Sequence, residues 1–329
     1  MTAEPLLQVR GLATWFETPR GIAKVLDGLD LDVGRGEIVG LVGESGSGKS
    51  VTAYSVVRLV RPPGSVVAGR VLFEGRDLLS LPEGQMRHVR GKEISMIFQD
   101  PRGYLDPVAR VGNVLNEIYR THEQASRKEA KARALELLRA VGLPAPERVY
   151  RAYPHELSGG MAQRAMIALA LACSPKLLIA DEPTTALDVT IQIQIVRLLA
   201  ELRTQLDLSI LLITHNLSVV AEVCDRVAVM YAGEVVENGA AREIFESPRH
   251  PYTVGLLRAR PRIGTVEEKL ADIPGRVPDL LELPAGCRFH PRCFLADDRC
   301  RHEAPGLRPL MPDHVSRCHY AERVQEDAA

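Results

Sequence analysis

Residues 43–50 read GESGSGKS, and this stretch decides the fold of the chain. It fits the pattern G-x-x-x-x-G-K-[ST], and it stands between an apolar run typical of a strand, residues 37–42, and a segment expected to be a helix, residues 49–60. Glycines let the backbone curl so that successive N–H groups point at phosphate oxygens, and the start of a helix adds a favourable dipole. A glycine-rich turn that matches by chance is the alternative, but the strand–loop–helix context favours a phosphate-binding loop.

The polar residues that end this loop, and an acidic pair further on, predict Mg-ATP chemistry. We expect Lys49 to reach the β- and γ-phosphates and the Ser50 hydroxyl to bind Mg²⁺. A second apolar run, residues 177–180, leads into Asp181 and Glu182. Because ligands of open α/β sheets bind at the carboxyl ends of strands, Asp181 is expected to hold the Mg²⁺ shell and Glu182 to face the γ-phosphate. Two acids in a surface turn are the alternative for this pair taken alone.

The order of apolar segments indicates the fold class. Short apolar runs alternate with helical segments, which predicts a parallel sheet with helices on its faces, and residues 6–17 with the turn that follows predict an antiparallel hairpin at its edge. Residues from about 101 to 172 have apolar positions at helical spacing and are expected to form an inserted helical subdomain. We therefore predict a nucleotide-binding domain over residues 1–250 and a Cys-rich C-terminal extension over residues 251–329.

Composition restricts the function classes. Lys and Arg total 41 against 42 Asp and Glu, so a strongly basic footprint for nucleic acid is absent. The first residues have neither a basic nor an apolar signal region, and the longest apolar run, residues 165–173, is about half a membrane span. We therefore expect a chain that does not cross a bilayer itself and that meets a membrane only through partners.

A second glycine motif separates this chain from other nucleotide-binding proteins. In residues 157–163, LSGGMAQ, Ser158 is a good helix N-cap, and Gly159 and Gly160 leave backbone N–H groups open to an anion. A plain helix cap is the alternative from cap chemistry alone. The segment resembles the signature motif of the ABC ATPase superfamily.

Further markers of that superfamily follow in its order, over at least residues 6–260. Gln99 resembles the Q-loop glutamine, residues 186–188 (ALD) resemble the D-loop, and His215 resembles the switch histidine. Phe16 lies where the family places an aromatic ring under the adenine, although the neighbouring Trp15 is the alternative for that role.

The resemblance implies a RecA-like P-loop ABC ATPase core whose two copies pair head to tail. ATP then lies between the phosphate loop of one chain and the signature segment of another, so a second ATPase chain, identical or a paralogue, is required. Glu182, His215 and Gln99 are the expected catalytic residues, and Ser50, Gln99 and Asp181 the expected Mg²⁺ ligands. The residues expected to contact nucleotide are Phe16, Gly43, Ser45, Gly46, Ser47, Gly48, Lys49, Ser50, Val51 and Asp181, with Ser158, Gly159 and Gly160 on the ATP of the partner.

Other segments narrow the subfamily. Residues 153–157 (YPHEL), 230–233 (MYAG) and 248–253 (PRHPYT) are similar to the oligopeptide, dipeptide and nickel importers. That likeness implies peptide import, with nickel or another small solute as the alternative. It also implies two transmembrane permease subunits, an extracytoplasmic solute-binding protein reached through them, and a place at the cytoplasmic face of the inner membrane.

Three rival functions share the phosphate motifs. A DNA-acting ABC ATPase needs a long coiled coil between the phosphate loop and the signature, and no heptad insertion is present. A translation-associated ABC protein normally has two ATPase domains, whereas this chain has one phosphate loop. An ABC exporter subunit is disfavoured by the C-terminal importer features.

Four cysteines gather near the C-terminus. Cys287, Cys293, Cys300 and Cys318 have the spacing C-x5-C-x6-C-x17-C. Without a secretion signal a disulfide framework is not expected, whereas four thiolates can hold Zn²⁺ or a [4Fe–4S] cluster. The extension resembles that of peptide-importer ATPases that carry such a cluster, so we expect [4Fe–4S] here. Zinc, with help from His290, His302 or His319, and free thiols are the alternatives.

Overall fold

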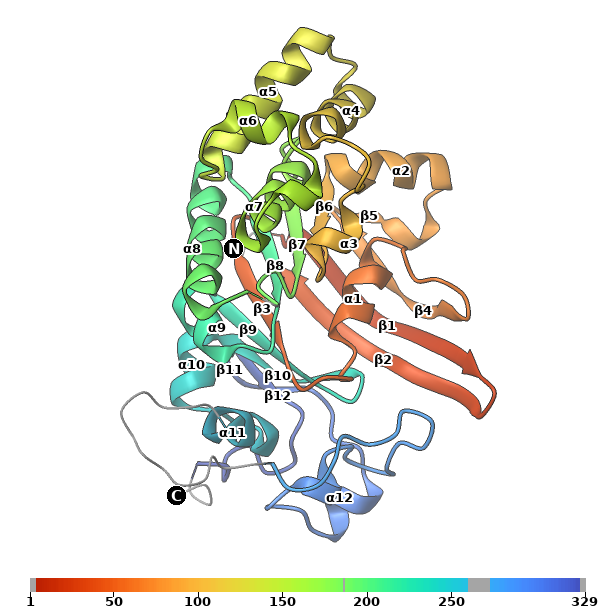
Figure 1. Cartoon of the computed structure of the whole chain (residues 1–329). Coiled ribbons are helices and arrows are strands. Elements are labelled where there is room, and N and C mark those ends of the chain that lie inside the picture. Colours follow the sequence, from red (N-terminus) through yellow and green to blue (C-terminus); the bar gives the residue numbers. More distant parts are fainter. Residues whose placement is uncertain (1–3, 186, 260–272, 326–329) are drawn as a thin grey trace. The chain divides into compact units, whose positions relative to one another are not determined.

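The computed structural model describes residues 4–185, 187–259 and 273–325, and these fall into two compact units. The first unit contains residues 33–38 and 80–213, and the second contains residues 7–32, 39–79 and the described chain from residue 214 onward. Each unit is built from stretches that are distant in sequence. Figure 1 shows the elements in chain colours.

Three parallel strands form the centre of the first unit. β7 (Leu177–Asp181) pairs with β6 (Ile94–Ile97) on one side and with β8 (Ser209–Ile213) on the other. All residues of β7 and β8 are buried, as expected for strands of a parallel sheet that is covered on both faces. The predicted parallel arrangement is thus confirmed, and the carboxyl end of β7 falls at Asp181 as the sequence indicated.

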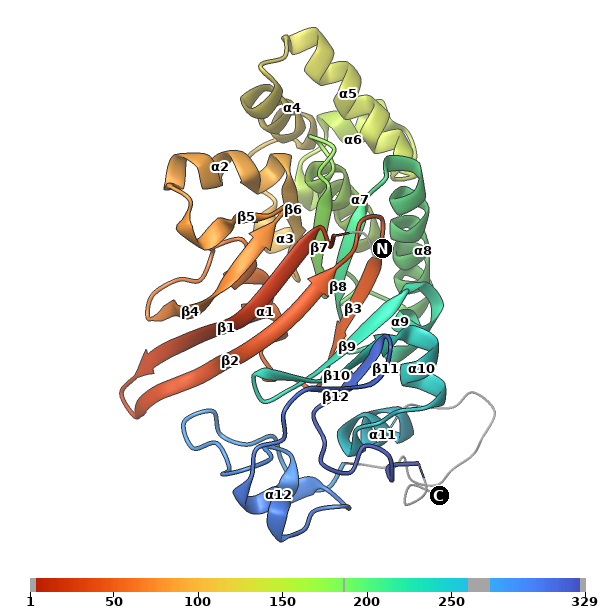
Figure 2. The same ribbon diagram turned by 180° about the vertical axis from the view of Figure 1, so that it is seen from behind.

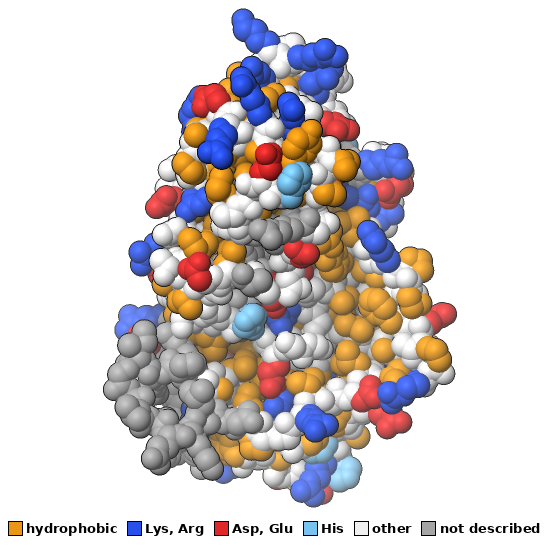
Figure 3. Space-filling view, viewed as in Figure 1, with side chains coloured by type: hydrophobic (Ala, Val, Ile, Leu, Met, Phe, Trp, Pro, Cys, Tyr) orange, Lys and Arg blue, Asp and Glu red, His pale blue; other side chains and the backbone are white. Residues whose placement is uncertain are grey.

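The chain between β6 and β7 is mostly helical. Lys and Arg side chains gather on the surface of two of these helices, α4 (Val111–Glu123) and α5 (Arg127–Ala140), as Figure 3 shows. The Ser126 capping box starts α5, and Gly142, in the left-handed conformation (φ 69°) typical of a helix C-terminal cap, follows its end. The helices described in this unit are α2 (Glu83–Lys92), α3 (Pro101–Tyr104), α4 (Val111–Glu123), α5 (Arg127–Ala140), α6 (Pro146–Arg151), α7 (Gly159–Ala170) and α8 (Val189–Leu206), with a 3-10 turn at Pro154–Glu156. A further 3-10 turn, Leu78–Ser80, comes where the chain passes from the second unit to the first.

The second unit contains the predicted edge hairpin. The long strands β1 (Leu7–Thr18) and β2 (Gly21–Val33) lie side by side in a four-stranded sheet of order β2-β1-β4-β5 (Figure 2). β4 (Gly64–Phe73) runs antiparallel to β1, and β5 (Arg76–Asp77) runs antiparallel to β4.

A second set of strands in this unit carries the phosphate loop. β3 (Ile38–Val42) pairs in parallel with β9 (Arg226–Tyr231), which pairs antiparallel with β10 (Glu234–Ala240). α1 (Lys49–Val56) follows the loop and is shorter than the predicted 49–60. Arg58 takes a left-handed conformation (φ 54°) and its N–H donates to Ser55 O, so a backbone cap ends α1 before the prolines at 62 and 63.

The C-terminal extension adds strands to the same unit, which the sequence did not indicate. β12 (His314–Ser316) pairs antiparallel with β10, and β11 (Arg308–Met311) pairs with β12. The remaining helices of this unit are α9 (Leu217–Val223), α10 (Ala241–Glu246), α11 (Pro251–Arg258) and α12 (Asp298–His302), with a 3-10 turn at His290–Arg292. None of the helices in the described ranges is both long and apolar enough to span a membrane.

A buried polar pair fastens β12 to β10. His314 Nε2 lies 2.7 Å from Glu237 Oε1, and the two side chains are 1% and 0% exposed. The backbone N–H of Arg249 donates to the same carboxylate oxygen. Because a buried polar group is costly without a partner, this pair makes the position of the last strands specific.

We expect His314→Ala to destabilise the protein by about 1–3 kcal/mol, because it leaves the buried Glu237 side chain without its side-chain partner. Thermal unfolding followed by circular dichroism measures the loss, and His302→Ala, which truncates an exposed histidine, is the matched control. Equal melting temperatures for the two variants would contradict a stabilising role for the pair.

Candidate nucleotide site

The phosphate loop is shaped by close backbone contacts that only glycine permits. A Cβ on Gly43 (φ 156°) would lie 2.2 Å from Met230 O of β9, and one on Gly48 (φ 104°) would lie 2.9 Å from Val25 O of β2. Gly46 (φ 83°) faces open space and is exposed together with Ser45. The loop therefore packs against the sheet at both ends and opens to solvent in the middle, as a cradle for an anion requires.

The predicted lysine lies inside this cradle. Lys49 is buried, and its Nζ donates to Gly43 O (2.8 Å) and Glu44 O (2.9 Å). Ser50 and Val51 follow in the first turn of α1, whose N-cap is Gly48 and so contributes no side chain to the helix start. The N–H of Gly233, in the turn after β9, donates to Ser47 O and ties the loop down from the other side.

The acidic pair lies in the first unit, at the carboxyl end of β7. Asp181 is 1% exposed, and Glu182 takes a left-handed conformation (φ 46°) that is rare for a residue with a side chain. The N–H of Glu182 donates to Ile213 O and so continues the β7–β8 ladder. Strained backbone of this kind persists where the surroundings fix it, and it is frequent at functional sites.

Two side chains hold the Glu182 carboxylate. Gln99 Nε2 donates to Glu182 Oε2 over 2.9 Å, and Thr185 Oγ1 donates to the same oxygen over 2.7 Å. The structure thus brings together Gln99 and Glu182, which are distant in sequence. Thr185 is a member of this group that sequence reasoning did not assign, although its place in the turn after Glu182 was a signal.

The signature segment forms a helix start, as its composition predicts. Ser158 is the N-cap of α7, and its side chain accepts from the N–H of Met161 (3.3 Å). Asp188 in the D-loop is the N-cap of α8 and accepts from the N–H of Ile191 (3.0 Å), whereas Ala186 lies outside the described residues. Gly159 and Gly160 make the first turn of α7.

The two remaining predicted residues belong to the second unit, like the phosphate loop. His215 is exposed and comes two residues after β8, beside Asn216, the N-cap of α9. Phe16 is half-buried in β1 opposite Gly64, and a Cβ on Gly64 would lie 2.5 Å from the Phe16 ring.

The predicted [4Fe–4S] cluster in the C-terminal extension is wrong, and so is its zinc alternative. All four extension cysteines are described, and within the described residues no three His, Cys, Asp or Glu side chains form a group that could hold a metal ion. The histidine rings are engaged elsewhere. Nδ1 of His290 lies 2.9 Å from Cys287 O, and Nε2 of His319 lies 3.0 Å from Glu303 O.

The surroundings of the extension thiols favour their protonated form. Burial, with a smaller contribution from neighbouring cysteines, raises the pKa of Cys287 to about 11 and the pKa values of Cys293 and Cys318 to about 12. These thiols are therefore protonated at neutral pH. The Sγ atoms of Cys293 and Cys318 instead accept from backbone N–H groups two residues on. Four cysteines close together near the C-terminus were therefore insufficient to predict a metal site.

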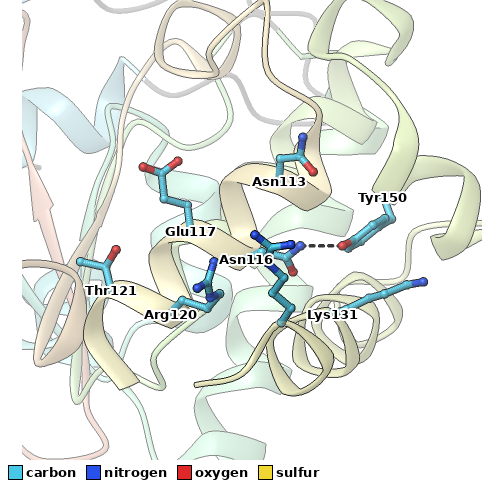
Figure 4. A pocket seen from close by; sticks show the side chains of 8 residues that line it. Asn113, Asn116, Glu117, Arg120, Thr121, Lys131 and Tyr150 are labelled. Atoms are coloured by element: carbon cyan, nitrogen blue, oxygen red, sulfur yellow. Dashed lines mark hydrogen bonds between the residues drawn. The ribbon is translucent and has the colours of Figure 1, made fainter. Parts of the chain in front are cut away.

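A separate polar pocket of about 680 Å³ lies among the helices of the first unit (Figure 4). Asn116 Nδ2 donates to Tyr150 Oη across it over 2.6 Å. None of the residues predicted to bind nucleotide lines this pocket, so it is distinct from the phosphate loop. Its lining residues are Asn113, Asn116, Glu117, Arg120, Thr121, Arg127, Lys131 and Tyr150.

A glycine loop between a parallel strand and a helix, with an acidic pair after another parallel strand, defines the class of phosphate-loop NTPases. Comparison with known proteins specifies the family. Residues 26–185 match the family model of ABC transporters, and residues 236–300 match that of the oligopeptide/dipeptide transporter C-terminal region.

Whole-chain relatives agree with these matches. The dipeptide transport ATP-binding protein of Escherichia coli is 48% identical over 96% of both chains. The oligopeptide transport ATP-binding protein of Bacillus subtilis is 53% identical over 86% of this chain and 80% of its own. The chain therefore belongs to the ATP-binding proteins of the ABC transporter family.

Solved structures show the same fold. A dimeric bacterial ABC transporter cassette matches with a TM-score of 0.65 and 28% identity, over 72% of this chain and 99% of its own. A post-hydrolysis state of that cassette, bound to ADP and Pi, matches with a TM-score of 0.64 and 27% identity, over 72% of this chain and 99% of its own. The predicted ABC ATPase core is thus confirmed.

Gly43→Ala is expected to abolish nucleotide binding, because its Cβ would collide with the backbone carbonyl of Met230 and force the loop out of shape. Equilibrium dialysis against labelled ATP measures the effect. Gly84→Ala in α2, where a Cβ meets nothing within 4 Å, is the control and should bind like the wild type. Full binding by Gly43→Ala would show that the observed loop is not the one that holds phosphate.

Proposed function

We propose that this chain hydrolyses ATP to drive the import of di- or oligopeptides through an ABC transporter at the cytoplasmic face of the inner membrane. The observation that carries the proposal is the near-complete alignment with a dipeptide transport ATP-binding protein at 48% identity. The C-terminal match to oligopeptide/dipeptide transporters supports the same solute class. In this proposal residues 1–250 form the nucleotide-binding domain and residues 251–329 the transporter-type extension.

The phosphate loop is the proposed ATP site. The cradle fits a polyphosphate, since its middle is open and the Lys49 ammonium group lies within it. Lys49 would exchange its loop carbonyls for phosphate oxygens, and Phe16 would stack on the adenine. Mg²⁺, held by Ser50, Gln99 and Asp181, would neutralise charge on the phosphate oxygens when bound. The loop residues Gly43, Ser45–Gly48 and Val51 would contribute backbone N–H groups.

Glu182 is the proposed group that activates water. Its carboxylate is held by Gln99 and Thr185, so its orientation is fixed before a substrate arrives. A carboxylate in that position can accept a proton from an attacking water molecule. His215 is proposed to stabilise the γ-phosphate and the water.

A second ATPase chain, identical or a paralogue, is the proposed partner in catalysis. One chain has one phosphate loop and one signature segment, and the dimeric cassettes of similar fold are built from two chains. Ser158, Gly159 and Gly160 at the start of α7 would then contact the ATP of the partner through open backbone N–H groups.

The permease subunits are proposed to bind the segment after Gln99. Tyr104 stacks on Phe98 with ring centroids 3.9 Å apart, yet it remains 52% exposed, and Val108 is 82% exposed. Apolar side chains held outward on a loop are typical of a protein–protein contact. Because Gln99 donates a hydrogen bond to Glu182, a movement of this segment would shift the catalytic carboxylate. An extracytoplasmic solute-binding protein would deliver peptide through the permease.

Glu182→Gln is predicted to retain ATP binding but to lower turnover by roughly 10²–10⁴-fold, since a positioned base is lost. Lys49→Ala is predicted to lose binding itself, because the charge opposite the β- and γ-phosphates is gone. ATP binding and phosphate release by the purified variants separate these effects. In cells that lack the chain, the wild type should restore uptake of labelled dipeptide and Glu182→Gln should not. Uptake restored by Glu182→Gln would reject the assigned role.

The isolated chain is predicted to hydrolyse ATP slowly, with a rate per chain that rises with protein concentration and again with permease-containing membranes. The reason is the divided site, in which two chains supply the phosphate loop and the signature. Phosphate release at increasing protein concentration, with the oligomeric state followed by light scattering, tests this. Full-rate hydrolysis by a proven monomer would contradict the divided site.

A further inference from the structure

The C-terminal extension reaches directly into the phosphate loop. Arg292, at the end of the 3-10 turn His290–Arg292, makes a two-pronged ion pair with Glu44, the second residue of the loop. Nη1 lies 2.7 Å from Oε2, and Nη2 lies 3.0 Å from Oε1. The Arg292 side chain is 3% exposed and that of Glu44 is 28% exposed. Two parallel N–H···O bonds fix the direction of a carboxylate as well as its charge.

Arg292 is itself held in place. Its Nε donates to Pro274 O (2.8 Å) and its Nη2 to Ile273 O (3.3 Å). The guanidinium also lies over the rings of Tyr231 and Phe289, with Cζ 5.8 Å and 5.9 Å from their centroids. These contacts restrict the Arg292 side chain to one conformation. An exposed arginine in a surface ion pair has no such restriction.

A tyrosine from α11 holds the backbone of the same loop residue. Glu44 N–H donates to Tyr252 Oη over 2.8 Å, and Tyr252 is fully buried against Tyr231 and Phe289. Burial raises the pKa of Tyr252, so its hydroxyl is neutral at physiological pH and can accept this bond without adding charge. Residues after position 250 thus engage both the carboxylate and the N–H of Glu44.

This arrangement addresses an electrostatic problem in the loop. Glu44 lies directly beside Gly43, in a segment proposed to bind a triphosphate, and a negative carboxylate there repels the ligand. An arginine paired with that carboxylate cancels the charge and keeps the side chain in one orientation. A loop held in its binding shape also loses less freedom when the ligand arrives.

We propose that Arg292 is a positioning residue of the nucleotide site, which neutralises and orients Glu44 so that the phosphate loop accepts ATP. ATP affinity then depends on the Arg292–Glu44 ion pair, whose arginine the C-terminal extension supplies. This inference rests on the proposed binding of ATP at residues 43–50.

The extension also supplies a matched control. Arg288 is largely buried, and it donates to Ala232 O and to Asp27 Oδ2, both over 2.7 Å. It joins the extension to β2 within the second unit and has no hydrogen bond to the Glu44 carboxylate among those described. Arg288 Nε also lies 3.8 Å from Glu234 Oε2. Arg288→Gln and Arg292→Gln therefore each remove a largely buried arginine of the extension from its ion pairs, and only the second removes the partner of a loop carboxylate.

The test is the binding of a fluorescent ATP analogue with Mg²⁺ to the full-length chain, titrated for the wild type, Arg292→Gln, Glu44→Gln/Arg292→Gln and Arg288→Gln. Arg292→Gln should raise Kd roughly tenfold, because a repelling and misplaced loop group is left behind. The double variant should recover most of that loss, and Arg288→Gln should stay within about twofold of the wild type. In steady-state hydrolysis the change should appear in KM more than in kcat.

Three outcomes would overturn the inference: unchanged affinity in Arg292→Gln, an equal loss in Arg288→Gln, or no recovery in the double variant. Thermal unfolding checks that each variant is folded. Arg292→Lys, which keeps the charge without the two-pronged geometry, replaces Arg292→Gln if that variant fails to fold. Its Kd for the ATP analogue should lie between that expected for Arg292→Gln and that of the wild type. Absence of nucleotide binding by the wild-type chain would instead reject the proposed function, so the two failures are distinguishable.

Discussion

The close approach of β9 to the end of β3 is the constraint on which the nucleotide site depends. Met230 O occupies the space that a side chain at position 43 would need, and the turn after β9 donates the Gly233 N–H to Ser47 O. The loop keeps the curled conformation that an anion requires because it packs against the neighbouring strand β9. Glycine at position 43 is thus required by the packing of the strands, in addition to any contact with a ligand.

The C-terminal extension is part of the same construction. β12 pairs with β10, and Arg292 and Tyr252 both engage Glu44 in the loop. An extension whose residues contacted only one another would form a separate domain. Here its aromatic and charged side chains form one wall of the phosphate loop, so the extension and the loop share a single set of contacts.

The cysteines show where sequence spacing is a weak guide. Four clustered thiols in an extension without a secretion signal predicted a metal, yet within the described residues no three such side chains form a group that could hold one. The Sγ atoms of Cys293 and Cys318 accept backbone hydrogen bonds. Burial raises the pKa values of these two thiols. The extension is anchored instead by strand pairing and by the packing of Phe289 on Tyr231 and Tyr252.

The sequence by itself determined the phosphate loop, the strand that ends at Asp181 and the capped start of α7, because each is a local pattern whose chemistry and backbone conformation are set by neighbouring residues. It did not indicate that Gln99 and Thr185 hold the Glu182 carboxylate, that α1 ends at a left-handed Arg58, or that Arg292 pairs with Glu44. Only the tertiary structure decided these. Gln99 and Glu182 are 83 residues apart, and Arg292 and Glu44 are 248 residues apart, and such contacts follow from strand order and packing, which leave no fixed spacing in the sequence. The Thr185 contact and the end of α1 are local, but several backbone and side-chain conformations are open to a short segment until packing selects one.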